Sequence, residues 1–122
     1  MLASDFAEPH VENVVSAADS WSADLTFDAD AMYFQGHFPG FPILPGVVQF
    51  GTAHHFAETF VRRPLRIKVV KKLKFQRIIQ PGEKVRFMVE RKSDSEYAFC
   101  YAIDGDVCSS GTMVVNNMAS VG

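Results

Sequence analysis

One histidine stands in a short segment that is rich in proline and glycine. The segment runs from Gly36 to Gly46 and holds three of the chain's six prolines and three of its eight glycines around His37. Proline fixes φ and lacks an N–H, and glycine permits close approach of the backbone, so this segment can hold the imidazole in one place. Pro45 and Gly46 precede a stretch with helical periodicity, and the first N–H groups of a helix have no partners within it. A fixed imidazole beside free N–H donors is suited to removing a proton next to a carbonyl and to stabilising the resulting enolate.

The same segment carries a resemblance to a known family. GHFPGFPILPGV, at 36–47, resembles the active-site signature of the hotdog-fold 3-hydroxyacyl-[acyl carrier protein] dehydratases of fatty acid synthesis. KFQRIIQPGE, at 74–83, resembles the strand and Pro-Gly turn that follow the central helix in that family, and DGDVC, at 104–108, resembles its last hairpin more weakly. The sequence of residues 41–49 is most similar to that of the dehydratase-like proteins of aryl-polyene-type lipid gene clusters.

The resemblance implies a fold, a reaction and roles for single residues. The fold would be an α+β hotdog domain, in which an antiparallel sheet wraps one central helix. The reaction would be dehydration of 3-hydroxyacyl thioesters, without a cofactor, in fatty acid or related lipid synthesis. His37 would exchange the α-proton, and the backbone N–H of Gly46 or Val47 would hold the thioester oxygen. The other expected substrate-binding residues are Phe38, Pro39, Gly40, Phe41, Pro42, Pro45 and Gly51.

Gly51 departs from the family pattern. The family places a helix Glu or Asp at this position to protonate the departing hydroxyl, and glycine has no proton to give. His55 would lie one helical turn further on, about 6 Å along the axis, which makes its imidazolium a candidate acid. The alternative is that His54 and His55 are ordinary polar residues on a half-exposed helix face. Two other functions also stay open: a hotdog thioesterase, and a non-catalytic acyl-carrier-binding subunit, for which Gly51 is the best evidence.

The charge of the chain is unevenly distributed although its net value is only −2. No Lys or Arg occurs before Arg62, and every charged residue from Arg62 to Arg77 is basic. A strand is predicted over 65–79, with mostly apolar residues on one parity and mostly basic residues on the other. This face could be merely solvated, but it also suits an acidic acyl carrier protein, while the acidic remainder of the chain disfavours nucleic acid. The expected carrier-docking residues are Arg66, Lys68, Lys72 and Lys74.

The remaining pattern predicts an antiparallel sheet and one helix. Alternation predicts strands over 23–28, 84–91, 97–103 and 107–115, and apolar spacing predicts a helix over 47–61, with Val47 among its apolar residues. A tight turn at Asp104 and Gly105 would pair Cys100 with Ser109 and leave Cys108 on the opposite face, which disfavours a disulfide.

Length and composition limit the other possibilities. With 122 residues and 48% hydrophobic content, the chain is expected to form a single domain over 1–122. It shows no apolar run that could span a bilayer and no secretion signal, so we expect a cytoplasmic protein without membrane partners. Its four histidines lack metal-ligand spacing, so no metal is expected. A homodimer, or a higher homo-oligomer of dimers, is expected because each site in the resembling family takes its histidine from one chain and its helix from the next. The substrate would be linked to acyl carrier protein or CoA.

Overall fold

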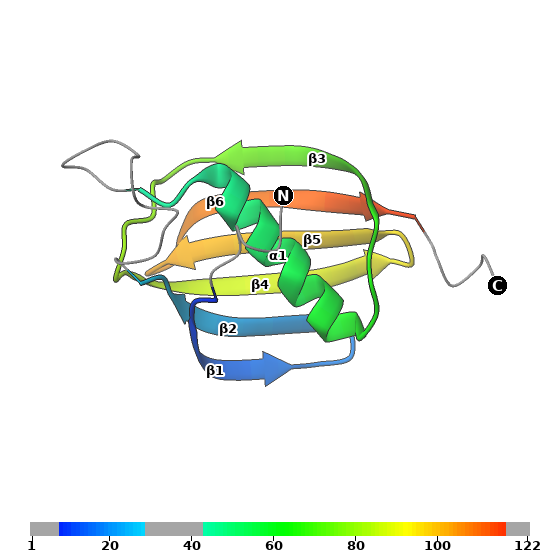
Figure 1. The fold of residues 1–122 in the computed structure, drawn as a ribbon, viewed down its shortest axis with the longest axis horizontal. Coiled ribbons are helices and arrows are strands. Elements are labelled where there is room, and N and C mark those ends of the chain that lie inside the picture. The colour runs from blue at the N-terminus through cyan, green and yellow to red at the C-terminus, as the bar shows by residue number, and fades with distance from the viewer. Residues whose placement is uncertain (1–7, 29–42, 117–122) are drawn as a thin grey trace.

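The computed structural model describes residues 8–28 and 43–116 of the chain. In this part, one helix, α1 (Gly46–Val61), lies across a sheet of six strands (Figure 1). The strands run in the order β1-β2-β4-β5-β6-β3, and neighbouring strands are antiparallel. Their bounds are β1 His10–Ser16, β2 Ser20–Thr26, β3 Ile67–Phe75, β4 Lys84–Ser93, β5 Glu96–Ile103 and β6 Asp106–Val115. The predicted α+β arrangement, with an antiparallel sheet around one helix, is confirmed.

The core lies between α1 and the middle of the sheet. Strict alternation in β5 turns Tyr97, Phe99 and Tyr101 towards the helix, and each is at most 3% exposed. Ala53 and Ala57, one turn apart on α1, are fully buried, so the helix backbone can approach the sheet closely. The prediction of strands over 84–91, 97–103 and 107–115 is confirmed, and the strand predicted over 23–28 is observed as β2.

The helix begins one residue earlier than predicted, and its buried stripe matches the predicted apolar spacing only in part. Val47 is 61% exposed, whereas Val48, Thr52 and Phe56 are buried together with Ala53 and Ala57. Small or apolar residues occupy so much of the first two turns that their spacing does not single out one face. The helix ends after Val61, and Arg62 takes a left-handed conformation with φ 60°.

β3 is shorter than predicted, and its apolar side chains are not buried. It lies at the edge of the sheet, and its last residue, Phe75, lies beside the start of α1 (Figure 1). Val69, Leu73 and Phe75 are 51%, 45% and 53% exposed. Register shifts on either side of the 69–71 pairs, together with φ 57° at Lys72, break the expected separation into one apolar and one basic face.

A β-bulge in β6 sets the face that each later residue presents. The turn itself is as predicted: Asp104 and Gly105 both have positive φ, and Ile103 pairs with Asp106. Cys100 nevertheless pairs with Ser110 and not with Ser109, because the register shifts by one residue after Ala102. The extra residue is Cys108, so Cys108 and Ser109 are both buried, and both cysteines are free thiols.

β1 was not predicted, because every one of its side chains is exposed and carries no periodic signal. A polar cluster holds it against the sheet. Asp24 accepts hydrogen bonds from Asn13 Nδ2 at 2.7 Å and from Arg86 Nη1 at 3.2 Å, and the same Nη1 donates to the Asn13 carbonyl at 2.9 Å. These contacts, Asn13 first and Arg86 second, lower the pKa of Asp24.

Candidate active site

The loop that carries His37 lies outside the described residues. The same is true of Phe38, Pro39, Gly40, Phe41 and Pro42. Their expected roles therefore stay predictions, and the geometry of the site begins at Ile43.

Leu44 anchors the chain where it leaves this loop. Its side chain is 3% exposed, and its N–H donates to the carbonyl of Ile79 at 2.7 Å. Pro45 then takes an extended conformation, with φ −63° and ψ 147°, and α1 begins at Gly46. The Pro45 carbonyl accepts hydrogen bonds from the N–H groups of Val48 and Gln49, at 3.1 Å each. The helix start is thus tied to the core immediately before its first turn.

The first two N–H groups of α1 are available as donors. Within the described part of the chain, neither Gly46 nor Val47 gives its N–H to an acceptor, and no side chain caps the helix. The positive end of the helix dipole adds to the potential of these donors. Such a pair can hold an anionic or strongly polarised oxygen.

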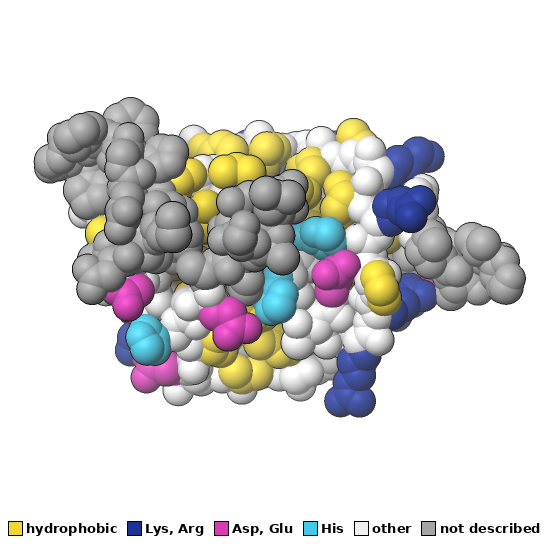
Figure 2. Space-filling view, in the orientation of Figure 1, with side chains coloured by type: hydrophobic (Ala, Val, Ile, Leu, Met, Phe, Trp, Pro, Cys, Tyr) yellow, Lys and Arg dark blue, Asp and Glu magenta, His cyan; other side chains and the backbone are white. Residues whose placement is uncertain are grey.

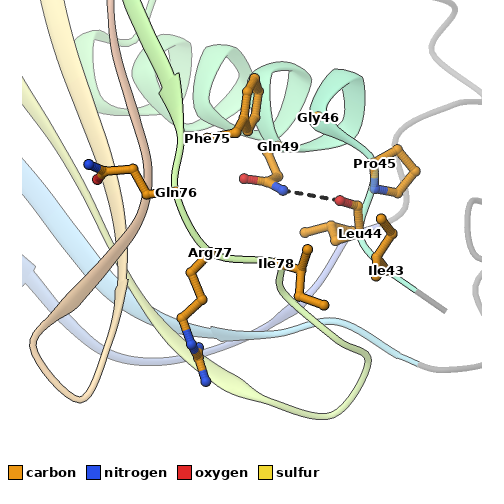
Figure 3. Close-up of a pocket in the computed structure, with 9 residues that line it drawn as sticks. All are labelled: Ile43, Leu44, Pro45, Gly46, Gln49, Phe75, Gln76, Arg77 and Ile78. Carbon is orange, nitrogen blue, oxygen red and sulfur yellow. Dashed lines mark hydrogen bonds between the residues drawn. The ribbon is translucent and has the colours of Figure 1, made fainter. Parts of the chain in front are cut away.

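A pocket of about 560 Å³ opens beside this helix start (Figure 3). Residues 43–46, Gln49 and residues 75–78 line it. Figure 3 shows Phe75, from the end of β3, beside the first turn of α1. A Cβ on Gly46 would come within 2.8 Å of Phe75 Cζ, so glycine at this position lets the ring lie close against the helix. The pocket is therefore mostly apolar, and Gly46, which carries one of the two free amides, is part of its lining.

Arg77 supplies a positive charge at the margin of the pocket, although its side chain points away from the centre in Figure 3. Its Nη1 lies 3.8 Å from Cys108 Sγ, and its Nη2 donates to Glu83 at 3.3 Å. The contact with Cys108, followed by the attraction of Glu83, raises the pKa of Arg77. The guanidinium stays charged and fixed to the end of the β5–β6 hairpin.

Gln49 also lines the pocket, although it is not among the predicted site residues. Its side chain is 4% exposed. Its Nε2 donates to the Leu44 carbonyl at 3.1 Å, and its Oε1 accepts a hydrogen bond from Ser109 Oγ at 2.6 Å. Tyr101 donates its hydroxyl proton to the backbone carbonyl of Gln49 at 2.8 Å. A glutamine among apolar helix residues was the available signal.

The other predicted helix residues lie farther along α1. Gly51 is buried, and His55 is 40% exposed with its Nε2 4.0 Å from Glu8 Oε1. His55 follows Gly46 by nine residues, or roughly 13 Å along the axis at the usual helical rise. It is not among the described residues that line the pocket of its own chain. A role for His55 beside Gly51 remains a prediction.

His54 serves the other end of the helix. Its Nε2 lies 2.7 Å from the Leu65 carbonyl and 3.2 Å from Glu58 Oε2, and the same carboxylate oxygen accepts the Leu65 N–H at 2.9 Å. Because a carbonyl oxygen can only accept, Nε2 carries the proton. His54 therefore ties the helix end to the connection before β3, and it points away from the pocket.

The four predicted docking residues, Arg66, Lys68, Lys72 and Lys74, are all exposed on or beside β3. Within the described residues none of them forms an ion pair, whereas Lys71 pairs with Glu96 at 2.8 Å. On the helix side of the molecule, Lys and Arg gather where α1 ends and β3 begins, while the β3 edge shows hydrophobic side chains (Figure 2). The basic residues are thus free to meet a partner, but they do not form one continuous face.

Across residues 8–28 and 43–116, no three His, Cys, Asp or Glu side chains are grouped as metal ligands would be. In the same ranges, α1 is too short and too polar to cross a membrane.

An antiparallel sheet around one helix, with free amides at the helix start, defines a hotdog-fold protein. The model of the ApeI-like family, described as ApeI dehydratase, matches residues 13–112. The chain therefore belongs to the ApeI-like dehydratase family.

Two curated relatives agree with this membership. The 3-hydroxyacyl-[acyl-carrier-protein] dehydratase FabZ of Lactiplantibacillus plantarum is 31% identical over 90 residues, which are 66% of this chain and 61% of the relative. FabZ of Desulfotalea psychrophila is 28% identical over 106 residues, covering 80% and 69%. The chain thus spans about three fifths of the first relative's length.

Two solved structures show the same fold. The dehydratase heterocomplex ApeI:P from Xenorhabdus doucetiae aligns with a TM-score of 0.82 and 26% identity, over 89% of this chain and 98% of that one. Thioesterase superfamily member 2 from Mus musculus aligns with a TM-score of 0.66 over 86% and 80%, but at 10% identity it supports the fold alone.

Proposed function

We propose that this chain dehydrates 3-hydroxyacyl thioesters to enoyl thioesters in fatty acid or related lipid synthesis. One observation carries the proposal: Gly46, whose N–H is unbonded within the described residues, lines a mostly apolar pocket and follows His37 closely in the sequence, in a member of a dehydratase family. The acyl group would be delivered on acyl carrier protein or CoA. The free thiols of Cys100 and Cys108 suit a cytoplasmic protein.

In the proposed reaction the thioester oxygen accepts hydrogen bonds from the Gly46 and Val47 amides. These bonds strengthen as negative charge grows on that oxygen, so they favour the enolate over the bound substrate. His37 takes the α-proton. The β-hydroxyl then departs and needs a proton to leave as water. We assign this proton to His55 of the second chain in a dimer, because Gly51 has no proton and His55 does not line the pocket of its own chain. The apolar lining keeps water away, which strengthens both steps.

We further propose that the working unit is a dimer joined along β3. Among the described strands, β3 has one edge without a neighbour, and the exposed side chains of Val69, Leu73 and Phe75 lie along this strand. A second chain paired there would cover these side chains and complete the sheet edge. Self-pairing is our first expectation.

The second candidate for the working unit is a heterodimer with a different hotdog chain. In such a heterodimer, this chain would be a subunit without a general acid of its own. Gly51 favours it, because a partner could carry the missing acid. The ApeI:P neighbour is itself a heterocomplex. Sedimentation of the purified chain, alone and with candidate partners, distinguishes the two assemblies.

Arg66, Lys68, Lys72 and Lys74 would attract the carrier protein. Acyl carrier proteins are acidic, and unpaired surface cations raise the rate at which an acidic partner is captured.

The test of the proposed reaction is the variant His37→Ala, assayed with 3-hydroxyacyl and with saturated acyl thioesters. Enoyl formation reports dehydration, and free thiol release reports a thioesterase. We expect wild type to form enoyl product and His37→Ala to lose it while keeping its melting temperature. His10→Ala, an exposed histidine on β1, is the matched control. Retention of most of the rate in His37→Ala, or thiol release without enoyl product, would contradict the proposal.

A further inference from the structure

Gln49 is a buried polar side chain that the proposed reaction does not use. It is 4% exposed, although a side-chain amide has two donors and an acceptor that all need partners when they leave water. The structure provides partners on two different elements: the Leu44 carbonyl ahead of α1 and the Ser109 hydroxyl on β6. Gln49 thus links the segment before α1 to β6. Figure 3 shows its bond to Leu44 at the lining of the pocket.

The orientation of this amide is fixed by chemistry. The Leu44 carbonyl can only accept a hydrogen bond, so the atom 3.1 Å from it must be the nitrogen. The hydroxyl of Ser109 then donates to Oε1 at 2.6 Å. A flipped amide would place two acceptors against each other at Leu44.

Leu44 is consequently held on both sides of its backbone. Its N–H is bonded to Ile79, and its carbonyl is bonded to Gln49. The next residue, Pro45, has no N–H, and α1 has no capping side chain. Within the described residues, the Gln49 amide is therefore the side chain that restrains the peptide between Leu44 and Pro45.

We propose that Gln49 is a positioning residue, which sets the direction of the Gly46 and Val47 N–H groups by holding the Leu44 carbonyl. The ring of Pro45 fixes φ, but rotation about its ψ would otherwise turn both amides relative to the Leu44 carbonyl. Donors at such a site act only when they point at the place where charge develops. The effect on the amides is independent of the reaction, while the effect on rate rests on the proposed dehydration.

The first experiment measures the amides directly. Gln49→Met keeps similar bulk and removes both side-chain hydrogen bonds, and Gln80→Met is the matched control outside the site. We expect the ¹⁵N–¹H signals of Gly46 and Val47 to move more in Gln49→Met than any amide outside 43–50. We expect them to stay in place in the control. If Gln49→Met does not fold, Ser109→Ala removes only the hydroxyl that orients the amide and should move the same two signals.

The second experiment measures turnover. A displacement of about 1 Å at a reacting group costs up to roughly 100-fold, so kcat of Gln49→Met should fall about 10- to 100-fold with KM nearly unchanged. Gln49→Glu adds a pH signature. A protonated carboxyl can donate to Leu44 and accept from Ser109, whereas the ionised form repels the Leu44 carbonyl, and burial raises the pKa of such a group. The kcat of Gln49→Glu relative to wild type should therefore rise as pH falls from 8 to 6. The relative kcat of Gln49→Met should stay flat, with both variants folded throughout.

Unmoved Gly46 and Val47 signals in a folded Gln49→Met would overturn the inference. A kcat within twofold of an active wild type would do the same. If wild type forms no enoyl product but the two signals move, the proposed function fails and the positioning role stands.

Discussion

The packing of this fold can be tested by replacing glycine with alanine at two positions, Gly111 and Gly46. A Cβ added at Gly111 would lie 2.9 and 3.1 Å from ring carbons of Phe99 and 3.2 Å from Leu73 Cδ1. Carbon atoms prefer separations of about 3.5–4.0 Å, so these neighbours must move. Phe99 is 3% exposed and packs against Tyr101 at a centroid distance of 6.1 Å, which leaves its ring little room.

The expected cost follows from these distances. Overpacking a filled core costs about 1–3 kcal/mol, and replacing a strand glycine by alanine returns about 0.5–1 kcal/mol. Gly111→Ala should therefore lower the free energy of unfolding by about 0.5–2 kcal/mol, which is roughly 2–8 °C in Tm for a domain of this size. At Gly46 a Cβ would come even closer, 2.8 Å from Phe75, but in the single chain Phe75 is 53% exposed and its ring can turn outwards. Gly46→Ala should therefore change Tm by no more than about 2 °C.

Thermal unfolding followed by circular dichroism, at one protein concentration for all three proteins, measures both shifts. Equal concentration matters because association would itself raise Tm. A Gly111→Ala protein that melts at or above the wild-type temperature would refute the packing argument. So would a Gly46→Ala protein that loses as much stability as Gly111→Ala.

Three further results are expected. Gly51→Glu should raise the rate of dehydration about tenfold, since general acids contribute 10²–10⁴-fold when well placed. The substitution His55→Ala should slow the wild-type enzyme more than it slows Gly51→Glu. A folded Gly51→Glu that is no faster, together with a fully active His55→Ala, would contradict the idea that the helix lacks an acid at position 51. Reversing Lys72 and Lys74 to Glu should weaken carrier-protein binding severalfold at about 0.01 M salt and much less at 0.1 M, where the Debye length falls from about 30 to 10 Å; binding that is insensitive to both charge and salt would count against docking. Folding lowers the pKa of Asp24, so its carboxylate stabilises the fold above pH about 4, and this contribution is lost as pH falls through the folded pKa. The Tm difference between wild type and Asp24→Asn should therefore shrink below pH 4. A constant difference from pH 7 to pH 2 would argue against this role.

Much of the sheet could be predicted from the regular alternation of buried and exposed residues. The places where this alternation is interrupted could not be predicted. Residues of β5 alternate between the two faces without exception, so the sequence identifies the strand. Parity along β3 groups residues by face, but it does not say whether anything covers that face, and the exposed Phe75 could not be foreseen. β1 has no buried side chain and left no pattern to detect.

The candidate site divides in the same way. Free amides at the helix start follow from the local sequence Pro45-Gly46, because a helix after proline begins without a capping side chain. Gln49 depends on Ser109, which lies 60 residues away and faces inward only after a bulge. No local pattern contains that contact.

The bulge at Cys108 restricts how the last hairpin can change in length. Without the extra residue, continued pairing from Ile103 with Asp106 would turn Ser110 and Thr112 inward and would expose Met113 to solvent. Substitutions in this hairpin alter one side chain, but a single insertion or deletion inverts the whole strand that follows. A one-residue change in the spacing between Gly105 and Ser109 should therefore destabilise the fold more than a substitution within this stretch, because it moves Met113 from the core to solvent.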